Sequence, residues 1–497
     1  MNLPNGHTIH LRRTLTVSFL LLHFLSYGQL KHHYEVEGGG VATTAERTPF
    51  WLRANQWGSV PEVAPFLTAQ SKIYANYAGD STRKKRRFEW GYGSWLVATA
   101  GQKSQLLLPE AFLKLRYGKL ELWAGRRRQV LGLVGDSLLT SGSYIESGNA
   151  LPLPRVQIGF MDYFPLLKGI VAFKGFVAHG WFDANPVVKN HYLHQKTLYL
   201  RLGKPGWPVR LYGGLNHNAQ WGGKVLITNQ YTVRDQLPSD WIDYWYVASG
   251  KRIPTFGYVD PAKYDAIDRG NRIGNHLGTF DVGVEIKNRS WNLLVYRQNI
   301  YDDGSLFYLA NVKDGLNGIT WTNSNVSTSD FYVKKILIEY LGTANQGGDI
   351  FSLDGGPRGR DNYFNHAQYK GWEYEGKIMG TPFITHETET KDELPRTSAL
   401  SATNNNRVRM LHLGLMGGWS TWQYIMKLSY SQNLGTYGIP FPPDINQFSA
   451  LTEVLFPLQH RRLGSLRGKI AVAADLGQLY PTTFGVYLGI RKTGIFR

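Results

Sequence analysis

Apolar and polar residues alternate with a period of two in many short segments of this chain. Every second residue is leucine in residues 197–202, and a similar alternation runs through residues 279–286 and 483–491. Successive side chains of a β-strand point to opposite faces, so each segment predicts a strand with one continuous apolar face. Many such strands in one chain restrict it to a sheet-based fold whose apolar faces must all be covered.

One longer apolar run lies near the start of the chain, at residues 14–25. It follows Arg12 and Arg13 and ends before a cleavage site at Ser26, Tyr27 and Gly28. This arrangement predicts a signal peptide over residues 1–28. The run is too short for a stable membrane-spanning helix, and no second long apolar run follows it. We therefore expect an exported protein.

An exported chain with many amphipathic strands is best explained by a transmembrane β-barrel, because only helices and closed barrels satisfy the backbone in lipid. Residues 29–497 would form one domain, and roughly 25 residues for each strand and its connection give about 16–20 strands. The alternative is two or three soluble β domains. The barrel is favoured because no Pro- or Ser-rich linker divides the chain. The 29 tyrosines and 15 tryptophans also suit the two membrane interfaces.

The predicted fold class is therefore all-β, a large antiparallel transmembrane barrel in the outer membrane of a Gram-negative bacterium. The absence of cysteine excludes disulfides and Cys-based sites. The net charge of +18 favours anionic partners such as lipopolysaccharide phosphates or an acidic polysaccharide. Nucleic acid is disfavoured, because the chain is exported and carries no recognition motif. The densest basic run, residues 83–87, is predicted to be a solvated turn near lipid headgroups, with contact to a polyanion as the alternative.

Three segments break the strand pattern. Residues 126–159 are too apolar for a surface loop, and Pro152 and Pro154 prevent regular ladder pairing, so we expect a segment folded inward or packed at the periplasmic mouth. Ser239 is predicted to be the N-cap of a helix with Trp241, Ile242, Trp245 and Tyr246 on one face. Residues 386–393 are rich in acidic side chains and are predicted to form a solvated outer loop rather than a Ca²⁺ site.

The sequence shows no local catalytic motif, and we expect a protein that is not an enzyme. Asp136 and Ser141 offer oxygen atoms, but no histidine lies near them in sequence. His191 and His194 lack a glutamate at the spacing of a zinc protease. We expect no metal and no cofactor. An outer-membrane enzyme acting on lipid or glycan, with partners distant in sequence, is the third-ranked alternative for function.

Four blocks of the chain resemble, in order, the Wzi-type capsule assembly family, and more specifically its Bacteroidetes branch. The first block contains Gly125, Arg126, Gly132, Asp136, Ser141, Gly142 and residues 147–154. The second covers residues 303–318, the third residues 338–347 and the fourth residues 361–382. Members of this branch and the enterobacterial type handle different glycans. The resemblance therefore supports the barrel fold more directly than it supports a role in capsule attachment.

The resemblance implies a large monomeric barrel with some helical structure at the periplasmic side, loops constricting the exterior, and a role in attaching or organising capsular or other surface polysaccharide. The implied partners are this polysaccharide, outer-membrane lipids and lipopolysaccharide, and the export machinery on the periplasmic side. A porin or substrate-specific channel is the second-ranked alternative, because a barrel of this size with polar inward faces suits one.

Sugars stack on aromatic rings and pair through their hydroxyl groups with polar side chains. The candidate glycan contacts are therefore Trp321, Asp361, Asn362 and Trp372, with a place in the aromatic interface girdle as the alternative for the two tryptophans. For Ser147 and Asn149 we expect a structural role, in which their side chains satisfy backbone groups next to Pro152 and Pro154. For Arg126 and Asp136 we expect a buried lumen ion pair rather than a ligand contact, and Ser141 belongs to the same motif.

Overall fold

The structure is a computed structural model that describes residues 31–77, 88–229, 232, 234–253, 260, 263–327, 330–352 and 359–496. The predicted signal peptide, residues 1–28, and the basic run at residues 83–87 lie outside the described residues.

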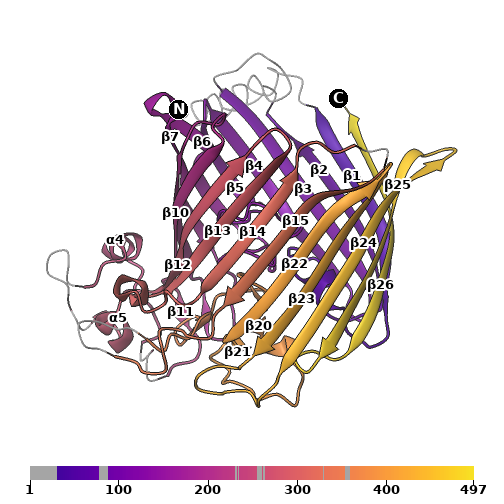
Figure 1. The fold of residues 1–497 in the computed structure, drawn as a ribbon. Coiled ribbons are helices and arrows are strands. Elements are labelled where there is room, and N and C mark those ends of the chain that lie inside the picture. Colours follow the sequence, from indigo (N-terminus) through magenta and orange to yellow (C-terminus); the bar gives the residue numbers. More distant parts are fainter. Residues whose placement is uncertain are drawn as a thin grey trace, which may run out of the picture.

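Eighteen antiparallel strands form one closed barrel, and neighbours in the chain are neighbours in the sheet (Figure 1). The sheet closes where β1 pairs with β26, with His32 opposite Phe496. The prediction of an all-β antiparallel barrel of about 16–20 strands is confirmed. In chain order the strands are β1 (His32–Thr43), β2 (Phe66–Ala75), β3 (Phe88–Gly101), β4 (Gln105–Tyr117), β5 (Leu120–Arg126), β6 (Arg155–Leu166), β7 (Val171–Trp181), β9 (Tyr192–Leu202), β10 (Val209–Trp221), β12 (Asn275–Lys287), β13 (Trp291–Asp302), β14 (Gly315–Asn323), β15 (Phe331–Gly342), β22 (Val408–Trp419), β23 (Trp422–Asn433), β24 (Asn446–His460), β25 (Gly464–Gly477) and β26 (Thr483–Phe496).

The alternating sequence pattern places apolar side chains on the outside of the barrel. Leu198, Leu200 and Leu202 of β9 are each about half exposed, whereas Thr197 and Tyr199 between them are buried toward the lumen. The same alternation holds along β12 and β26. An outward apolar face and a mixed inward face are what a barrel in lipid requires.

The two ends of the barrel have different connections. The end that holds His32 and Phe496 carries short turns, such as residues 118–119 between β4 and β5 and residues 420–421 between β22 and β23. The opposite end carries the long connections 44–65, 127–154, 222–274 and 343–407. These are called the short-turn end and the long-loop end below. Because outer-membrane barrels have short periplasmic turns and longer extracellular loops, we infer that the short-turn end faces the periplasm.

Helical structure is minor, as expected. Helix α2 (Phe50–Arg53) lies in the first long connection, whereas α4 (Trp241–Ser249) and α5 (Ala266–Gly270) lie outside the barrel wall beside the long-loop end (Figure 1). This position differs from the periplasmic placement that the family resemblance implies. The long β10–β12 connection carries both α4 and α5, and connections of that length belong to the outer side.

The details of α4 differ from the sequence-based prediction. Its N-cap is Asp240 instead of Ser239, because Asp243 one turn later accepts the N–H of Asp240 at 2.8 Å. Tyr246 is fully buried, but Trp241 and Trp245 are exposed, so these residues do not form one buried face. Among the described helices, none has the length and apolarity needed to cross a membrane.

Three long connections fold into the barrel and pack against each other. We call residues 44–65, 127–154 and the described part of 343–407 the plug. Its short paired segments are β16 (Asn365–His366) with β17 (Lys370–Gly371), β18 (Glu373–Tyr374) with β19 (Lys377–Ile378), and β20 (Thr385–His386) with β21 (Thr403–Asn405). The plug places a hydrophobic core inside the barrel, and the side chains at its centre are Trp51, Tyr144, Ile145, Tyr363, Phe364, Trp372 and Ile384.

Candidate functional site

The second plug segment, residues 127–154, crosses the lumen as irregular chain, in agreement with the predicted inward fold. The predicted bounds of 126–159 are too wide, because Arg126 ends β5 and residues 155–159 begin β6. Pro152 and Pro154 are buried or nearly so at its end, and the carbonyl of Pro154 accepts the N–H of Trp181 at 3.1 Å. Gly142 has a φ of +115°, and a Cβ atom there would lie 2.8 Å from that of Ser147. Glycine is therefore needed for both conformation and space.

Two carboxylates fix this segment to the wall. Glu339 of β15 accepts hydrogen bonds from the hydroxyl of Thr140 at 2.8 Å and the N–H of Ser141 at 2.6 Å. Asp136 accepts the N–H groups of Leu138 and Leu139 and pairs with Lys335 of β15 at 2.9 Å. Burial of Asp136 favours its neutral form, but Lys335 and the two N–H groups outweigh burial and hold its pKa below the usual value.

Ser147 and Asn149 join two plug segments. The hydroxyl of Ser147 donates to the carbonyl of Gly380 at 2.7 Å, and the amide of Asn149 donates to the carbonyl of Ile378 at 3.0 Å. Both side chains thus satisfy backbone groups in irregular structure, which is the role expected from the sequence.

Arg126 and Asp136 do not pair with each other. Arg126 donates to the hydroxyl of Tyr374 at 2.7 Å and lies 3.6 Å from Asp183. Asp183 is more than half exposed, so only the pair of Asp136 with Lys335 matches the expected buried lumen ion pair.

The four residues predicted as glycan contacts lie in three different environments. Trp321 is on the outward face of β14 near the short-turn end, where Leu293 and Ile336 flank it. Trp372 is fully buried, and its indole N–H donates to the carbonyl of Ile145 at 2.7 Å. Neither ring is presented to the space outside the long-loop end.

Asp361 and Asn362 lie where the third plug segment meets the β13–β14 connection. Asp361 accepts hydrogen bonds from Ser305 at 2.7 Å and Asn311 at 2.6 Å. Asn362 is exposed and accepts the amide of Asn406 at 2.6 Å. Of the four candidates, Asn362 is the one whose side chain is open to solvent.

The prediction of a solvated loop at residues 386–393 is wrong for its centre. Glu389 is buried and pairs with Arg53 of α2 at 2.6 Å. The acidic side chain points inward because the first plug segment supplies a buried arginine, which the local composition did not indicate.

The four blocks that resemble the Wzi-type family meet in and around the plug. Block one is hydrogen-bonded to block three, where Ser141 donates to Glu339, and to block four, where Ser147 donates to the carbonyl of Gly380. Block two reaches block three through Asp314, which accepts the N–H groups of Asn345 and Gln346 at 3.0 and 2.6 Å. The shared motif residues are therefore mainly residues that lock distant connections together.

Hydrogen bonds anchor the plug to inward-facing side chains around the barrel. The wall residues and their plug partners are Asp281 of β12 with Leu133, Gln298 of β13 with Tyr144, His412 of β22 with Leu139, Ser429 of β23 with Trp51, and Asp475 of β25 with Phe50. Anchoring on strands from β12 to β25 holds the plug across the lumen toward the long-loop end.

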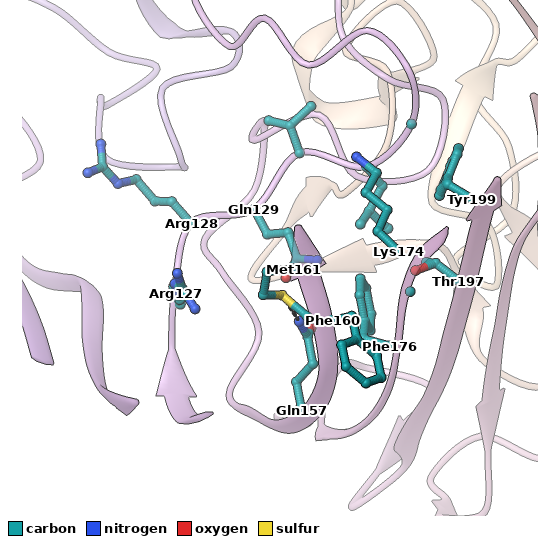
Figure 2. Close-up of a pocket in the computed structure, with 14 residues that line it drawn as sticks. Arg127, Arg128, Gln129, Gln157, Phe160, Met161, Lys174, Phe176, Thr197 and Tyr199 are labelled. Atoms are coloured by element: carbon teal, nitrogen blue, oxygen red, sulfur yellow. Dashed lines mark hydrogen bonds between the residues drawn. The ribbon is translucent and has the colours of Figure 1, made fainter. Parts of the chain in front are cut away.

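A cavity of about 460 Å³ lies between the plug and the short-turn half of the wall. Inward-facing residues of β1, β2, β3, β23, β24, β25 and β26 line it, and Trp51, Trp57, Ser137 and Leu138 of the plug form its floor. A smaller cavity of about 210 Å³ shares Arg128 with it. Figure 2 shows Lys174 and Tyr199 at one side of the smaller cavity and Arg127 and Arg128 at the other.

Basic side chains outnumber acidic ones in both cavities. Four of the lining cations are paired with carboxylates: Lys72 with Glu35, Arg128 with Glu110, Lys469 with Glu453, and Arg491 with Glu37. Lys427 of β23 is buried, with its ammonium 4.5 Å from the ring centroid of Trp51, and forms no ion pair with any described carboxylate. Lys174 of β7 similarly faces the rings of Tyr163 and Tyr199 at 5.2 and 5.4 Å.

The sequence interpretation did not single out these lysines. Their signal was present, because residues 170–179 and 422–430 also have the pattern that predicts a strand, and Lys174 and Lys427 occupy inward positions in them. What the sequence could not show is that neither lysine forms an ion pair with a described carboxylate, although Asp136, Glu453 and Glu339 act on Lys427 from a greater distance.

No cluster of three or more potential metal ligands occurs among the described residues. His191 stacks on Phe182 at 4.4 Å, whereas His194 faces Tyr244 of α4. Asp136 forms an ion pair with Lys335. The buried hydroxyl of Ser141 has no hydrogen-bond partner within the described structure.

A closed barrel with an apolar outer face, short turns at one end and a plugged lumen defines the fold of an outer-membrane β-barrel. Among solved structures, Wzi of Escherichia coli is similar, with a TM-score of 0.54 and 12% identity over 96% of this chain and 87% of that one. Wzi is described as an outer-membrane protein involved in group 1 capsule assembly and as a carbohydrate-binding β-barrel.

Two other solved structures show weaker similarity. OccK5 (OpdH) of Pseudomonas aeruginosa has a TM-score of 0.46 and 9% identity over 94% of this chain and 99% of that one. OccAB4 of Acinetobacter baumannii has a TM-score of 0.44 and 10% identity over 95% and 99%. No protein-family model matches the sequence, and no curated protein sequence matches it significantly. At sequence identities this low, structural similarity is evidence for a shared fold only.

Proposed function

We propose that this protein is a non-catalytic outer-membrane barrel that binds an acidic polysaccharide in its lumen and helps to retain it on the cell surface. The observation that carries the proposal is Lys427, a buried cation that lines the 460 Å³ lumen cavity and forms no ion pair with any described carboxylate. A buried charge is costly unless an opposite charge or hydrogen bonds compensate it. An anionic ligand in the cavity would supply that compensation.

The rest of the lining suits an acidic sugar chain. Trp51, Trp57 and Trp95 offer aromatic surfaces to the cavity, and Gln70 and Ser59 offer hydrogen-bonding groups. Uronic acid carboxylates would meet the basic side chains through charge-assisted hydrogen bonds.

The plug argues against the channel alternative. Its hydrophobic core lies inside the barrel and is hydrogen-bonded to strands from β12 to β25. Moving it aside would expose this core and break many buried hydrogen bonds. We therefore expect a barrel that conducts little or no steady ionic current.

The family resemblance and the fold shared with Wzi also support glycan binding. Wzi is described as carbohydrate-binding, and the four blocks that resemble its family hold the plug in place. Asp136, next to the cavity, is engaged by Lys335 and backbone N–H groups in a structural role. This supports a protein without catalytic activity.

The test is a binding titration of the full-length mature protein in detergent with an oligogalacturonate and with a neutral dextran oligosaccharide of similar length. We expect the wild type to bind the acidic probe and Lys427→Met to bind it roughly tenfold more weakly, since one charge-assisted hydrogen bond contributes about 1.5–3 kcal/mol. Lys168→Met, at an exposed turn between β6 and β7, is the matched control. Equal binding by all three proteins would refute the lumen site.

Two further measurements separate binding from transport. In planar bilayers we expect no steady conductance from the wild type, and a large steady current would favour a channel. In cells lacking the gene we expect polysaccharide to move from the surface to the medium. Complementation by the wild type should restore retention, and complementation by Lys427→Met should not.

A further inference from the structure

A third cavity lies on the outside of the barrel, where α4 meets the wall near the long-loop end. Its volume is about 640 Å³. Its walls are the outward faces of β9, β10, β12 and β13, the C-terminal end of α4, and Leu309 and Val312 of the β13–β14 connection. It is separate from the lumen, because outward and inward residues alternate along these strands.

One part of this cavity is apolar and continues the lipid-facing surface. Leu215 and Phe280 point outward on β10 and β12, where they are paired in register. Phe280, Leu309 and Val312 are each about half exposed or more. These side chains would contact acyl chains at the edge of the apolar band.

The other part of the cavity is polar, which is unusual for an outward barrel face. Lys196, His217 and His276 occupy outward positions on β9, β10 and β12. Charged residues on the lipid face are costly at the bilayer midplane and cost little near the interfaces. The cavity therefore spans the boundary between the apolar band and the headgroup region of the outer leaflet.

Two cations line the polar part. Lys196 donates to the carbonyl of Ala248, and Arg272 donates through Nε to the carbonyl of Gly250 at 2.7 Å, so both also hold the end of α4. Nη2 of Arg272 has no acceptor among the described residues. Asp303 also lines the cavity. With neutral histidines, Lys196, Arg272 and Asp303 together give the cavity a net charge of about +1.

The polar part also contains an imidazole pair. His217 Nε2 and His276 Nδ1 are 3.0 Å apart, and His276 Nε2 donates to the carbonyl of Ile273 at 2.8 Å. Nδ1 of the buried His217 has no hydrogen-bond partner within the described structure. This unpartnered group lines the cavity beside Lys196.

Helix α4 itself presents aromatic side chains outward. Trp241 and Trp245 are 72% and 51% exposed, which is costly in water but favourable where tryptophan meets lipid headgroups. From the apolar walls, the two cations and this exposed helix face, we propose that the cavity binds a phosphorylated glycolipid of the outer leaflet. Nδ1 of neutral His217 is an acceptor, and a sugar hydroxyl of this lipid would donate to it. The acyl chains would lie on Leu215 and Phe280, and a phosphate would reach Arg272 and Lys196.

The experiment titrates the full-length mature protein in detergent with diphosphoryl lipid A and, separately, with phosphatidylcholine. We expect lipid A to bind at least tenfold more tightly, and Arg272→Gln to weaken its binding by roughly tenfold, as expected for a charge-assisted hydrogen bond to phosphate. Arg269→Gln removes the same charge from an exposed site on α5 and should bind as the wild type does.

Because Arg272 also holds α4, a second variant tests the apolar wall without disturbing that contact. Leu309→Asn changes an exposed side chain and should weaken lipid A binding while the thermal unfolding midpoint stays unchanged. Wild-type affinity in both Arg272→Gln and Leu309→Asn, or equal affinity for phosphatidylcholine, would overturn the proposal. The lumen site is independent of these residues, so this result leaves the proposed glycan binding untouched.

Discussion

The carboxylate of Glu339 accepts the backbone N–H of Ser141 at 2.6 Å, although 198 residues separate the two in the chain. Glu339 belongs to the barrel wall and Ser141 to the plug, so this buried hydrogen bond fixes an irregular segment to a strand. The same carboxylate also accepts the hydroxyl groups of Thr140 and Tyr296. One wall residue thus organises much of the contact between plug and barrel.

Replacing Glu339 by alanine should loosen the plug. Three buried donors would lose their acceptor, and we expect the free energy of unfolding to fall by about 2–4 kcal/mol. Urea unfolding followed by tryptophan fluorescence measures this change, and bilayer recordings should show new conductance events. Glu393→Ala, at an exposed position of the third plug segment, should change neither. Wild-type stability of Glu339→Ala would show that the plug is held by other contacts.

The two tryptophans predicted as glycan contacts should respond very differently to truncation. Trp372→Ala removes a fully buried ring and its hydrogen bond to Ile145, and we expect a loss of about 3–5 kcal/mol in unfolding free energy. Trp321→Ala changes an outward ring near the short-turn end and should cost less than about 1 kcal/mol. Neither substitution should alter oligogalacturonate affinity in protein that remains folded. A selective loss of binding in Trp321→Ala would contradict its placement on the lipid face.

The barrel could be predicted because its signal is local. The alternation of apolar and polar residues over 197–202 or 279–286 indicates by itself that one face of each strand contacts an apolar environment. The strand count followed from chain length. The irregular segment followed from Pro152, Pro154 and its composition, although the structure limits it to residues 127–154. Each inference needs no knowledge of which residues meet in space.

The plug and the cavity could not be predicted in the same way, because they depend on contacts between distant segments. Trp372 and Asp361 are predicted from the sequence as glycan contacts, but their segment folds into the barrel and buries them wholly or in part. Glu389 seemed solvated because its partner, Arg53, lies in another connection. The importance of Lys427 appears only from the structure, where this buried lysine forms no ion pair with any described carboxylate.

The Arg53–Glu389 pair should make the protein sensitive to loss of either partner. Arg53, Lys377 and Arg47 outweigh the effect of burial and hold the pKa of Glu389 well below its usual value. We expect Arg53→Met to lose about 3–5 kcal/mol at neutral pH, because a buried carboxylate is left without its main partner. A carboxyl group with a lowered folded pKa stabilises the protein above its unfolded pKa and loses that effect as pH falls.

The difference in unfolding free energy between wild type and Arg53→Met should therefore shrink below about pH 4. Urea unfolding at several pH values measures it. Arg269→Met, which removes an exposed arginine, is the control and should follow the wild type at every pH. A difference that stays constant down to about pH 3 would mean that the arginine acts through packing and not through charge.

Asp361 should make stability decrease between acid and neutral pH. Burial raises its pKa to about 7, and the charges of Asp303 and Asp314 act in the same direction. Because the folded pKa lies above the unfolded value, the folded protein binds more protons than the unfolded chain between about pH 4 and pH 7. The free energy of unfolding falls as pH rises through that window, by at most about 1.4 kcal/mol per pH unit for one group.

Asp361→Asn should flatten this slope and raise stability at neutral pH relative to the wild type. Asp268 of α5, whose pKa burial also raises to about 7, remains in that variant, so the slope should be reduced and not abolished. The double variant with Asp268→Asn should reduce the slope further but not abolish it, because burial also raises the pKa of Asp303 to about 6. Urea unfolding at about pH 5 and about pH 7.5 gives the slope, with the fully exposed Asp392→Asn as control. A slope unchanged in the double variant would place the titrating groups elsewhere in the barrel.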